Sequence, residues 1–528
     1  MRNSVIAAAG AAVLVVVVLV LGLTGAVLPS TKGAAQPNET TRALQEINTA
    51  ATALAEAPAA TYSGRITQTI GSTSGETTVT DLTVTAAGTV SGKVQQRSGG
   101  TAQLIQIAGK TFVKGEEAFW RTRERPKQPA GVTVETPAAN KWVVVEESFL
   151  GIDLRAALRP SRMGLNLSQQ DTALGNTELS GTPTGPIGAT PDRRIGTGND
   201  PIGVSEVDVD ENDGGVPGDR RFLAGKLTIG VDGGGNAVAV RGPLGGGFGG
   251  GDGAVAEADL TIKALDAGAT RSIYTKIKSD LEAGKLGAWN VTIADPPGSL
   301  DCTPGASCVI GYTLNNTVPD LTSGTVIVDL HSSFKKNNVE FNTCTAKQDI
   351  PINAGARISC QVPYGPPADV DALTRFRVDV NGELDPAFLT QAVEQGQKIS
   401  ETPATWTPTS SKATPEARRY HLQVAVAPSN YVYTLNDFAF DGRETDGTLL
   451  LVYGPGYDAH VNGPVLDASW EGTEQLVAQA RDAKRAAGDT PVRMVFAEPR
   501  AADAMRATLD ANGVTGVEVV TVPAVVRS

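Results

Sequence analysis

The acid best placed for chemistry in this chain is Asp441, in the stretch FDGRETDGTLLLVYGPGY at residues 440–457. It follows a short apolar stretch, so we expect it at the end of a strand. A metal-dependent nuclease needs a second acid to share Mg²⁺ and a lysine to stabilise charge on the scissile phosphate. The apolar run 449–452 stands where that acid and lysine would lie. The stretch is therefore either an active site or only the framework of one.

Other polar residues of the same region could supply a relocated site. Gln479 lies three residues after Leu476 and four before Ala483, which places it on the helix face toward the sheet. Six charged or titratable residues in nearby turns and on the same helix are further candidates: Glu444, Asp446, Asp458, His460, Lys484 and Glu498. Turn acids are usually solvated, and Glu498 can cap the helix after it, so we favour this ordinary interpretation.

The elements that must position these residues begin near Arg418. The stretches YVYTL, FAFDG and TLLLVYG predict three short strands, and a helix follows at about 469–487. The stretch PVRMVFAE predicts the next strand, RAADAMRATLDANG a helix and VEVVTVP the last strand. This order implies one mixed sheet flanked by helices.

The region 418–528 resembles the restriction-endonuclease-fold toxin domains, of the fifth class, at the C-termini of bacterial polymorphic toxins. The resemblance rests on the order and spacing of FDG, GPGY, Trp470, QAR, FAEP, ANG and VVTVP. It implies that Asp441 is the first metal-binding acid and Gln479 a site residue. It also places the second acid at Leu451 and the lysine at Tyr453, so both of these charges are lost. Asp441 would be a poor site for Mg²⁺ by itself.

The charge balance agrees with a loss of nuclease activity. From residue 413 onward the chain has 10 Lys and Arg against 15 Asp and Glu, a net charge of −5, and the whole chain has −12. Nucleic acids favour basic faces. We therefore expect a degenerate toxin-like module used for binding or assembly, with no cofactor. The alternative is an active nuclease effector, which would take Mg²⁺, a nucleic acid and an immunity or envelope protein as partners.

The N-terminus carries a run of 24 uncharged residues, 5–28, after Arg2. This length favours a spanning helix over a signal-peptide core, and the positive charge of Arg2 favours an N-terminus in the cytoplasm. We expect residues 1–35 to be a single-pass anchor and linker in the cell membrane, with an N-terminus in the cytoplasm and the rest extracytoplasmic. A cleaved signal peptide is the alternative.

Residues 36–288 carry one helix and then strands of period two, with a Pro-, Gly- and Asp-rich stretch at about 171–221 that we expect to be a disordered insertion. The order of elements, GKTFVKG…FW…NKWVVV and the closing SIYTKIKSDL resemble actinobacterial LolA-like lipoproteins. That resemblance implies a curved antiparallel half-barrel that binds acyl lipid. A plain packed core is equally compatible with the pattern, and an envelope lipid-binding protein is thus a further hypothesis.

The four cysteines lie within residues 289–400, whose alternating strands are typical of an immunoglobulin-like sandwich. An even number of cysteines in an exported segment favours two disulfides. We prefer the local pairs Cys302–Cys308 and Cys344–Cys360 over zinc, because the spacings lack a C-x₂-C motif. Residues 401–417 read as a Pro/Thr/Ser-rich linker. The predicted fold class is thus multidomain α+β: transmembrane helix, half-barrel, sandwich and restriction-endonuclease-like α/β domain.

Overall fold

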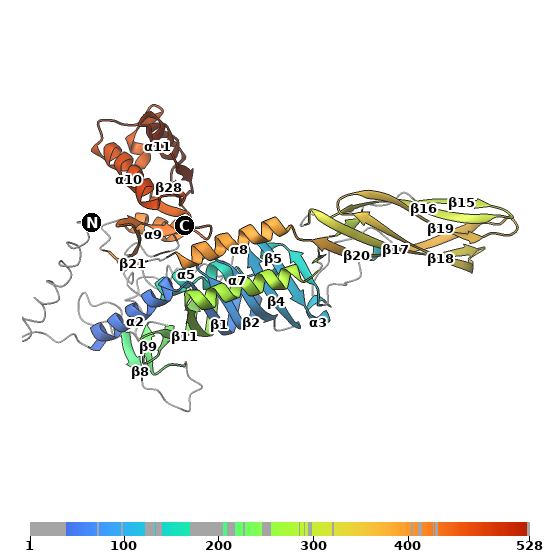
Figure 1. Ribbon diagram of the computed structural model, residues 1–528, viewed down its shortest axis with the longest axis horizontal. Coiled ribbons are helices and arrows are strands. Elements are labelled where there is room, and N and C mark those ends of the chain that lie inside the picture. The colour runs from blue at the N-terminus through green and yellow to red at the C-terminus, as the bar shows by residue number, and fades with distance from the viewer. Residues whose placement is uncertain are drawn as a thin grey trace, which may run out of the picture. The chain divides into compact units, whose positions relative to one another are not determined.

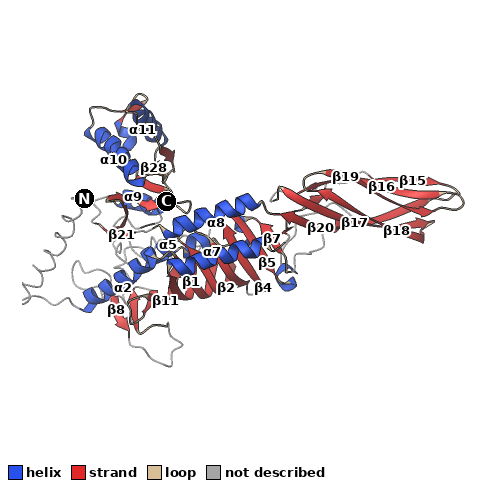
Figure 2. Ribbon diagram, viewed as in Figure 1, coloured by secondary structure: helices blue, strands red, loops and turns tan. Residues whose placement is uncertain are grey.

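Strands dominate the protein, as Figure 2 shows. The computed structural model describes residues 39–524 except 71–72, 97–98, 122–131, 134–139, 169–203, 208–216, 225–226, 245–254, 285, 290, 294–297, 319–320, 403–404, 410–413, 426 and 428–430. Residues 43–528 form one compact unit. Within the predicted disordered insertion, 171–221, the structure places strand β8 (Val204–Val207) and the start of β9 (Arg220–Ala224), and most of the rest lies outside the described residues.

The centre of the unit is an antiparallel sheet around β1 (Ala59–Ile70). On one side it continues through β2 (Thr73–Thr85), β3 (Val90–Gln96), β4 (Thr101–Ile107), β5 (Lys110–Gly115) and β7 (Trp142–Val145). On the other side it continues through β12 (Val255–Leu265), β11 (Ala237–Leu244), β10 (Leu227–Val231), β9 and β8. The alternating pattern seen in the sequence forms these strands.

Both faces of this sheet are buried. On β4, Leu104 packs into one apolar core with helices α2 (Glu39–Glu56), α3 (Glu117–Arg121), α4 (Leu154–Leu158) and α5 (Pro160–Leu167). Its neighbour Ile105 packs into a second core with α7 (Ala267–Glu282) and α8 (Pro386–Glu401). Successive strand residues point to opposite faces, so helices on both sides require apolar residues at both positions.

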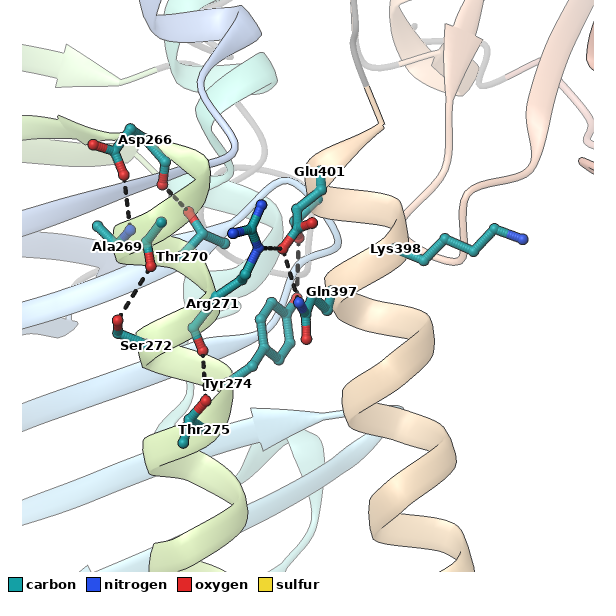
Figure 3. A network of polar contacts seen from close by, with 12 residues as sticks. Asp266, Ala269, Thr270, Arg271, Ser272, Tyr274, Thr275, Gln397, Lys398 and Glu401 are labelled. Atoms are coloured by element: carbon teal, nitrogen blue, oxygen red, sulfur yellow. Dashed lines mark hydrogen bonds and ion pairs between the residues drawn. The ribbon is translucent and has the colours of Figure 1, made fainter.

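Helices α7 and α8 lie side by side across the strands in Figure 1, although about a hundred residues separate them in the chain. Figure 3 shows that Arg271 of α7 and Gln397 of α8 both reach the carboxylate of Glu401, each at 2.9 Å. Between the helices, the buried Tyr274 hydroxyl contacts Ser400 and Thr85 hydroxyls, each at 3.0 Å. These contacts fix the C-terminal end of α8 against the turn after β2.

The chain between α7 and α8 forms the predicted sandwich. One layer holds β17 (Ser323–Lys336), β18 (Val339–Pro351) and β20 (Val370–Glu383). The other holds β14 (Thr292–Ile293), β15 (Gly298–Thr303), β16 (Ser307–Thr317) and β19 (Gly355–Pro363). Both predicted disulfides are present, Cys302–Cys308 within a hairpin and Cys344–Cys360 between the layers. No described cysteine is left for zinc.

The predicted fold class is wrong: the protein is mostly β and is not an α+β chain of separate domains. One sheet of 16 strands passes through both of the predicted β domains. The reason is the length of β20, which has 14 residues and extends beyond the sandwich. Its Gly382 pairs with Leu286 of β13 (Leu286–Ala288), and β13 runs parallel to β7. Backbone hydrogen bonds therefore continue from the sandwich into the central sheet.

The C-terminal region also differs from the single mixed sheet that a restriction-endonuclease fold requires. Strands β22 (Tyr431–Leu435) and β23 (Phe438–Phe440) join β21 (Thr405–Pro408) in one small sheet. A second sheet has the order β24 (Gly442–Arg443), β25 (Leu449–Tyr453), β28 (Val492–Phe496) and β29 (Val517–Thr521). Since FDG spans the break between the two sheets, the predicted restriction-endonuclease-like domain is corrected to two sheets with helices.

Three helices accompany those sheets: α9 (Pro415–Ala425), α10 (Glu471–Ala487) and α11 (Pro499–Ala511). Helices α10 and α11 lie where the sequence predicts them. The stretch predicted as the linker, 401–417, contains strand β21, and helix α9 begins within it at Pro415.

The predicted membrane anchor is corrected as well. Of the helices within the described part of residues 39–524, none is both long and apolar enough to cross a bilayer. The 18-residue α2, for example, carries Glu46 and Glu56. The single-pass topology and the cell-membrane localisation therefore find no support in the structure. Residues 5–28, on which that prediction rested, lie outside the described residues.

Candidate functional site

Asp441 lies between β23 and β24, and its carboxylate holds the edge of β25. The Asp441 backbone N–H donates to Leu450 O at 2.9 Å, and its Oδ2 accepts a hydrogen bond from Val452 N at 2.7 Å. These bonds continue the β24–β25 pairing by one step beyond the short β24. One oxygen of the predicted metal ligand is thus already used by the backbone.

The other carboxylate oxygen of Asp441 faces His421 of α9, with Oδ1 and Nε2 3.4 Å apart. The His421 Nδ1 lies 3.0 Å from the carbonyl oxygen of Ala427, which can only accept, so Nδ1 carries a proton. The imidazole is 8% exposed. His421 was not among the candidates from the sequence, because twenty residues separate it from Asp441.

Tyr453 and Gln479 form the second part of the cluster. The Tyr453 hydroxyl donates to Gln479 Oε1 at 3.0 Å, and the Tyr453 ring stacks on Phe496 with centroids 4.6 Å apart. Burial raises the pKa of the Tyr453 phenol well above its ordinary value, and the charge of Asp441 adds to this effect. Burial and Asp441 also raise the pKa of Tyr457. The structure thus gathers Asp441 and Gln479 around two neutral tyrosines.

Leu451, the position expected for the second acid, is fully buried. It pairs with Met494 of β28 and packs in the core that α10 and α11 cover. A carboxylate there would lose its hydration without gaining a partner. Position 451 is therefore a core position in this fold.

The alternative site residues have structural partners. The Glu498 Oε2 accepts from the backbone N–H groups of Gly456 and Asp458, at 3.0 and 2.9 Å. Asp458 Oδ1 in turn accepts from Ala501 N at 2.9 Å, in the first turn of α11. Glu498 precedes α11 but makes no side-chain cap, so Asp458 has the capping role that we predicted for Glu498.

The remaining candidates are also engaged locally. Asp446 Oδ1 accepts from Thr448 N at 2.8 Å within its own turn, and Glu444 pairs with Arg493. The His460 ring stacks on Trp470 with centroids 3.8 Å apart, and Lys484 Nζ donates to Gly488 O at 2.8 Å. None of these contacts brings a second acid to Asp441.

Metal binding has little basis in this arrangement. Among the described residues no group of three or more His, Cys, Asp or Glu side chains is placed to hold an ion. The Asp441–His421 pair supplies two groups, and its carboxylate already accepts a backbone hydrogen bond.

The core of the curved-sheet half contains a group of packed aromatic side chains. Trp120 stacks on Trp289 with centroids 4.9 Å apart, and Phe149 lies against both rings. These aromatic groups continue into the core under α2 and α5. Lipid binding by this half stays a prediction.

Comparison with known proteins does not assign a family. No family model and no curated protein matches the sequence. Among solved structures, a β-galactosidase structure from Bacteroides fragilis is 9% identical over 54% of this chain and 40% of its own, with a TM-score of 0.14. A glycosyl hydrolase family 2 member from Bacteroides cellulosilyticus DSM 14838 is 8% identical over 56% and 36%, with a TM-score of 0.14.

This chain spans well under half the length of those two proteins. Likeness at such TM-scores does not establish a common fold, so nothing about their activity is carried to this chain. The comparisons also give no support to the toxin and LolA-like resemblances.

Proposed function

We propose that the C-terminal region, residues 418–528, is a non-catalytic module for binding or assembly. The observation that carries this proposal is the burial of Leu451, at 0% exposure, where a metal-dependent nuclease would need its second acid. Asp441 is committed to Val452 N and His421. An ion at Asp441 would therefore have to displace bonds that hold β25.

The proposal expects no Mg²⁺ requirement and no phosphodiester cleavage. From residue 413 onward the chain carries a net charge of −5, which disfavours nucleic acid as the partner of this region. The proposal therefore favours a protein as the partner of this region. An active nuclease with a relocated site is not favoured, because the alternative acids are engaged in turns and caps.

The direct test incubates the purified whole protein with plasmid DNA and with single-stranded RNA, in millimolar Mg²⁺ or Mn²⁺. We expect no cleavage above that of an Asp441→Ala variant prepared in parallel. Cleavage by the wild-type protein that this substitution abolishes would refute the proposal. Calorimetric titration with Mg²⁺ adds a readout independent of turnover, and we expect no heat of binding.

A further inference from the structure

A group of arginines lies where α4 and α5 meet the C-terminal region. We call Arg155, Arg159, Arg162 and Arg443 the arginine cluster. Arg159 links α4 to α5 and is 8% exposed, and its Nη2 donates to the carbonyl oxygen of Arg443 at 3.2 Å. A carbonyl oxygen carries no net charge. This bond therefore brings no negative charge to Arg159.

A second buried group in the cluster has no partner. The Nε of Arg162, one turn after Arg159, is enclosed and makes no hydrogen bond. Burial, and then the charges of Arg162, Arg443 and Arg155, lower the pKa of Arg159 to about 10. Like charges close enough to do this repel one another in a poorly hydrated place. Buried charges are normally paired, so an anion would complete this arrangement.

Two carboxylates, Glu444 and Asp153, act on the arginine cluster. Glu444 opposes the effect of the arginines on Arg159, but its carboxylate is bound to Arg493. Asp153 favours the charged form of Arg162, yet the Nε of Arg162 stays unpaired. Arg493 thus competes with Arg159 for Glu444, and the Nε of Arg162 has no acceptor.

The backbone around the cluster also suits an anion. Arg159 precedes the eight-residue α5 and its side chain makes no cap. Pro160 opens α5 and has no N–H, so the donors at this end are the N–H groups of Ser161 and Arg162. The start of α5 is thus electropositive at the same place as the guanidinium groups. The uncapped start and the buried guanidinium groups are independent observations that point to one kind of ligand.

The walls of the junction are fixed by close contacts. Arg443 donates to Ile399 O at 2.9 Å, at the end of α8, and to the Tyr433 hydroxyl at 3.2 Å. A Cβ built on Gly88 would come within 2.9 Å of both Arg155 Cγ and Thr445 Cγ2. The turn after β2, the end of α8 and the turn after β24 therefore surround the arginines.

We propose that the arginine cluster binds a small tetrahedral oxyanion of the phosphate class. Guanidinium groups offer planar pairs of donors that match phosphate oxygens, and a dianion balances several of them where one carboxylate would not. The ligand is either free phosphate or the phosphate group of a larger molecule. This inference is independent of the non-catalytic role proposed for residues 418–528.

The test measures thermal unfolding of the whole protein, dialysed into chloride buffer, as inorganic phosphate is added at constant ionic strength. We expect the Tm to rise and to saturate with phosphate, because a ligand that binds the folded state stabilises it. Glycerol phosphate, titrated in parallel, distinguishes the two sources: tighter binding than phosphate assigns the site to a phosphomonoester. A wild-type protein whose Tm responds to neither compound would overturn the proposal.

Arg162→Met separates a binding role from a structural one. We expect its Tm in phosphate-free buffer to equal or exceed that of the wild type, because an uncompensated cation has been removed. We also expect its phosphate dissociation constant to rise at least about tenfold. A lower Tm with an unchanged phosphate response would assign Arg162 to the structure alone and refute the proposal.

Two further variants complete the design. Arg485→Gln is the matched control, since Arg485 is exposed on α10 and pairs with Asp482, and its phosphate response should equal that of the wild type. Arg159→Lys keeps the charge but removes the planar pair of donors. This variant should therefore fold but bind phosphate more weakly than the wild type. It provides the decisive measurement if Arg162→Met does not fold, and unchanged binding by Arg159→Lys would then refute the proposal.

Discussion

The group around Asp441 and the arginine cluster both include residues at or next to β24, and they differ in how their charges are satisfied. Asp441 has a backbone donor for one oxygen and His421 beside the other. In the arginine cluster, Arg159 has one neutral acceptor and the Nε of Arg162 has none. Buried polar groups are normally paired. We therefore interpret the first cluster as structural and the second as a binding site.

The strongest test of the structural interpretation is Leu451→Glu, which puts an acid at the position where the toxin-domain resemblance expects one. We expect a loss of about 4 kcal/mol in the free energy of unfolding, because the carboxylate would be buried without a partner. Urea denaturation measures this loss. Leu373→Glu is the control, since Leu373 is 53% exposed and should tolerate the change. Near-wild-type stability that increases with Mg²⁺ would contradict the structural interpretation.

Within the arginine cluster, Arg443→Met should lower the stability of the protein, whereas Arg162→Met should leave it unchanged or raise it. Arg443 has Ile399 O and the Tyr433 hydroxyl as acceptors, and its guanidinium lies over the Tyr433 ring. We expect a loss of about 2 kcal/mol in phosphate-free buffer, because these groups would lose their partner. Urea denaturation of both variants under one condition makes the comparison. Equal destabilisation by both would show that partnering does not distinguish the two arginines.

Asp441→Asn tests the structural role of the acid. The amide oxygen can still accept from Val452 N, but the charge beside His421 is lost, so we expect a loss of about 1.5 kcal/mol. Asp441→Ala should cost more, because it leaves Val452 N unpaired. Chemical denaturation at neutral pH provides the measurement. A gain in stability would mean that the carboxylate is strained there, as expected for a functional acid.

The smallest expected effect at neutral pH is that of Tyr453→Phe, about 0.5–1 kcal/mol for the lost bond to Gln479. Its pH dependence is more informative. Burial raises the folded-state pKa of Tyr453 above its unfolded value near 10, so the folded state retains the proton more strongly. The stability from this phenol is complete below about pH 10 and is lost as the pH rises further.

We therefore expect the wild type to lose about 1.4 kcal/mol more per pH unit above pH 10 than Tyr453→Phe does. The urea midpoints of the two proteins, measured from neutral to alkaline pH, should converge and then cross. Parallel pH profiles would show that the Tyr453 phenol is not buried in solution.

Much of the local structure could be predicted. Alternating residues indicate most strands, and helical spacing places α10 and α11. The cysteine spacing favours the two pairs that the structure contains. Helix α8 is absent from our predictions, although Asp385 accepts from Ala387 N as its cap and Pro386 opens it. That signal was available within the chain, and the regular strand pattern before it led us to extend the sandwich to residue 400.

The candidate site was predictable only in part. The apolar run 449–452 already excluded a second acid next to Asp441, whichever fold it belongs to. His421 could not be assigned to Asp441, since nothing local indicates that α9 crosses β25. The spacing of Arg155, Arg159 and Arg162 is visible in RAALRPSRM at residues 155–163, but a basic face of a helix is usually solvated.

The sequence by itself indicated most strands, the preferred disulfide pairs and the apolar run 449–452, because these follow from periodicity, spacing and residue type. Tertiary structure alone decided that β20 joins the sandwich to the central sheet, that α8 returns beside α7, and that Arg159 meets Arg443. Those last two residues are 284 positions apart, and burial of the charges there depends on what packs around them. Whether a buried charge is paired depends on neighbours that are distant in the chain, so the tertiary structure is needed to show it.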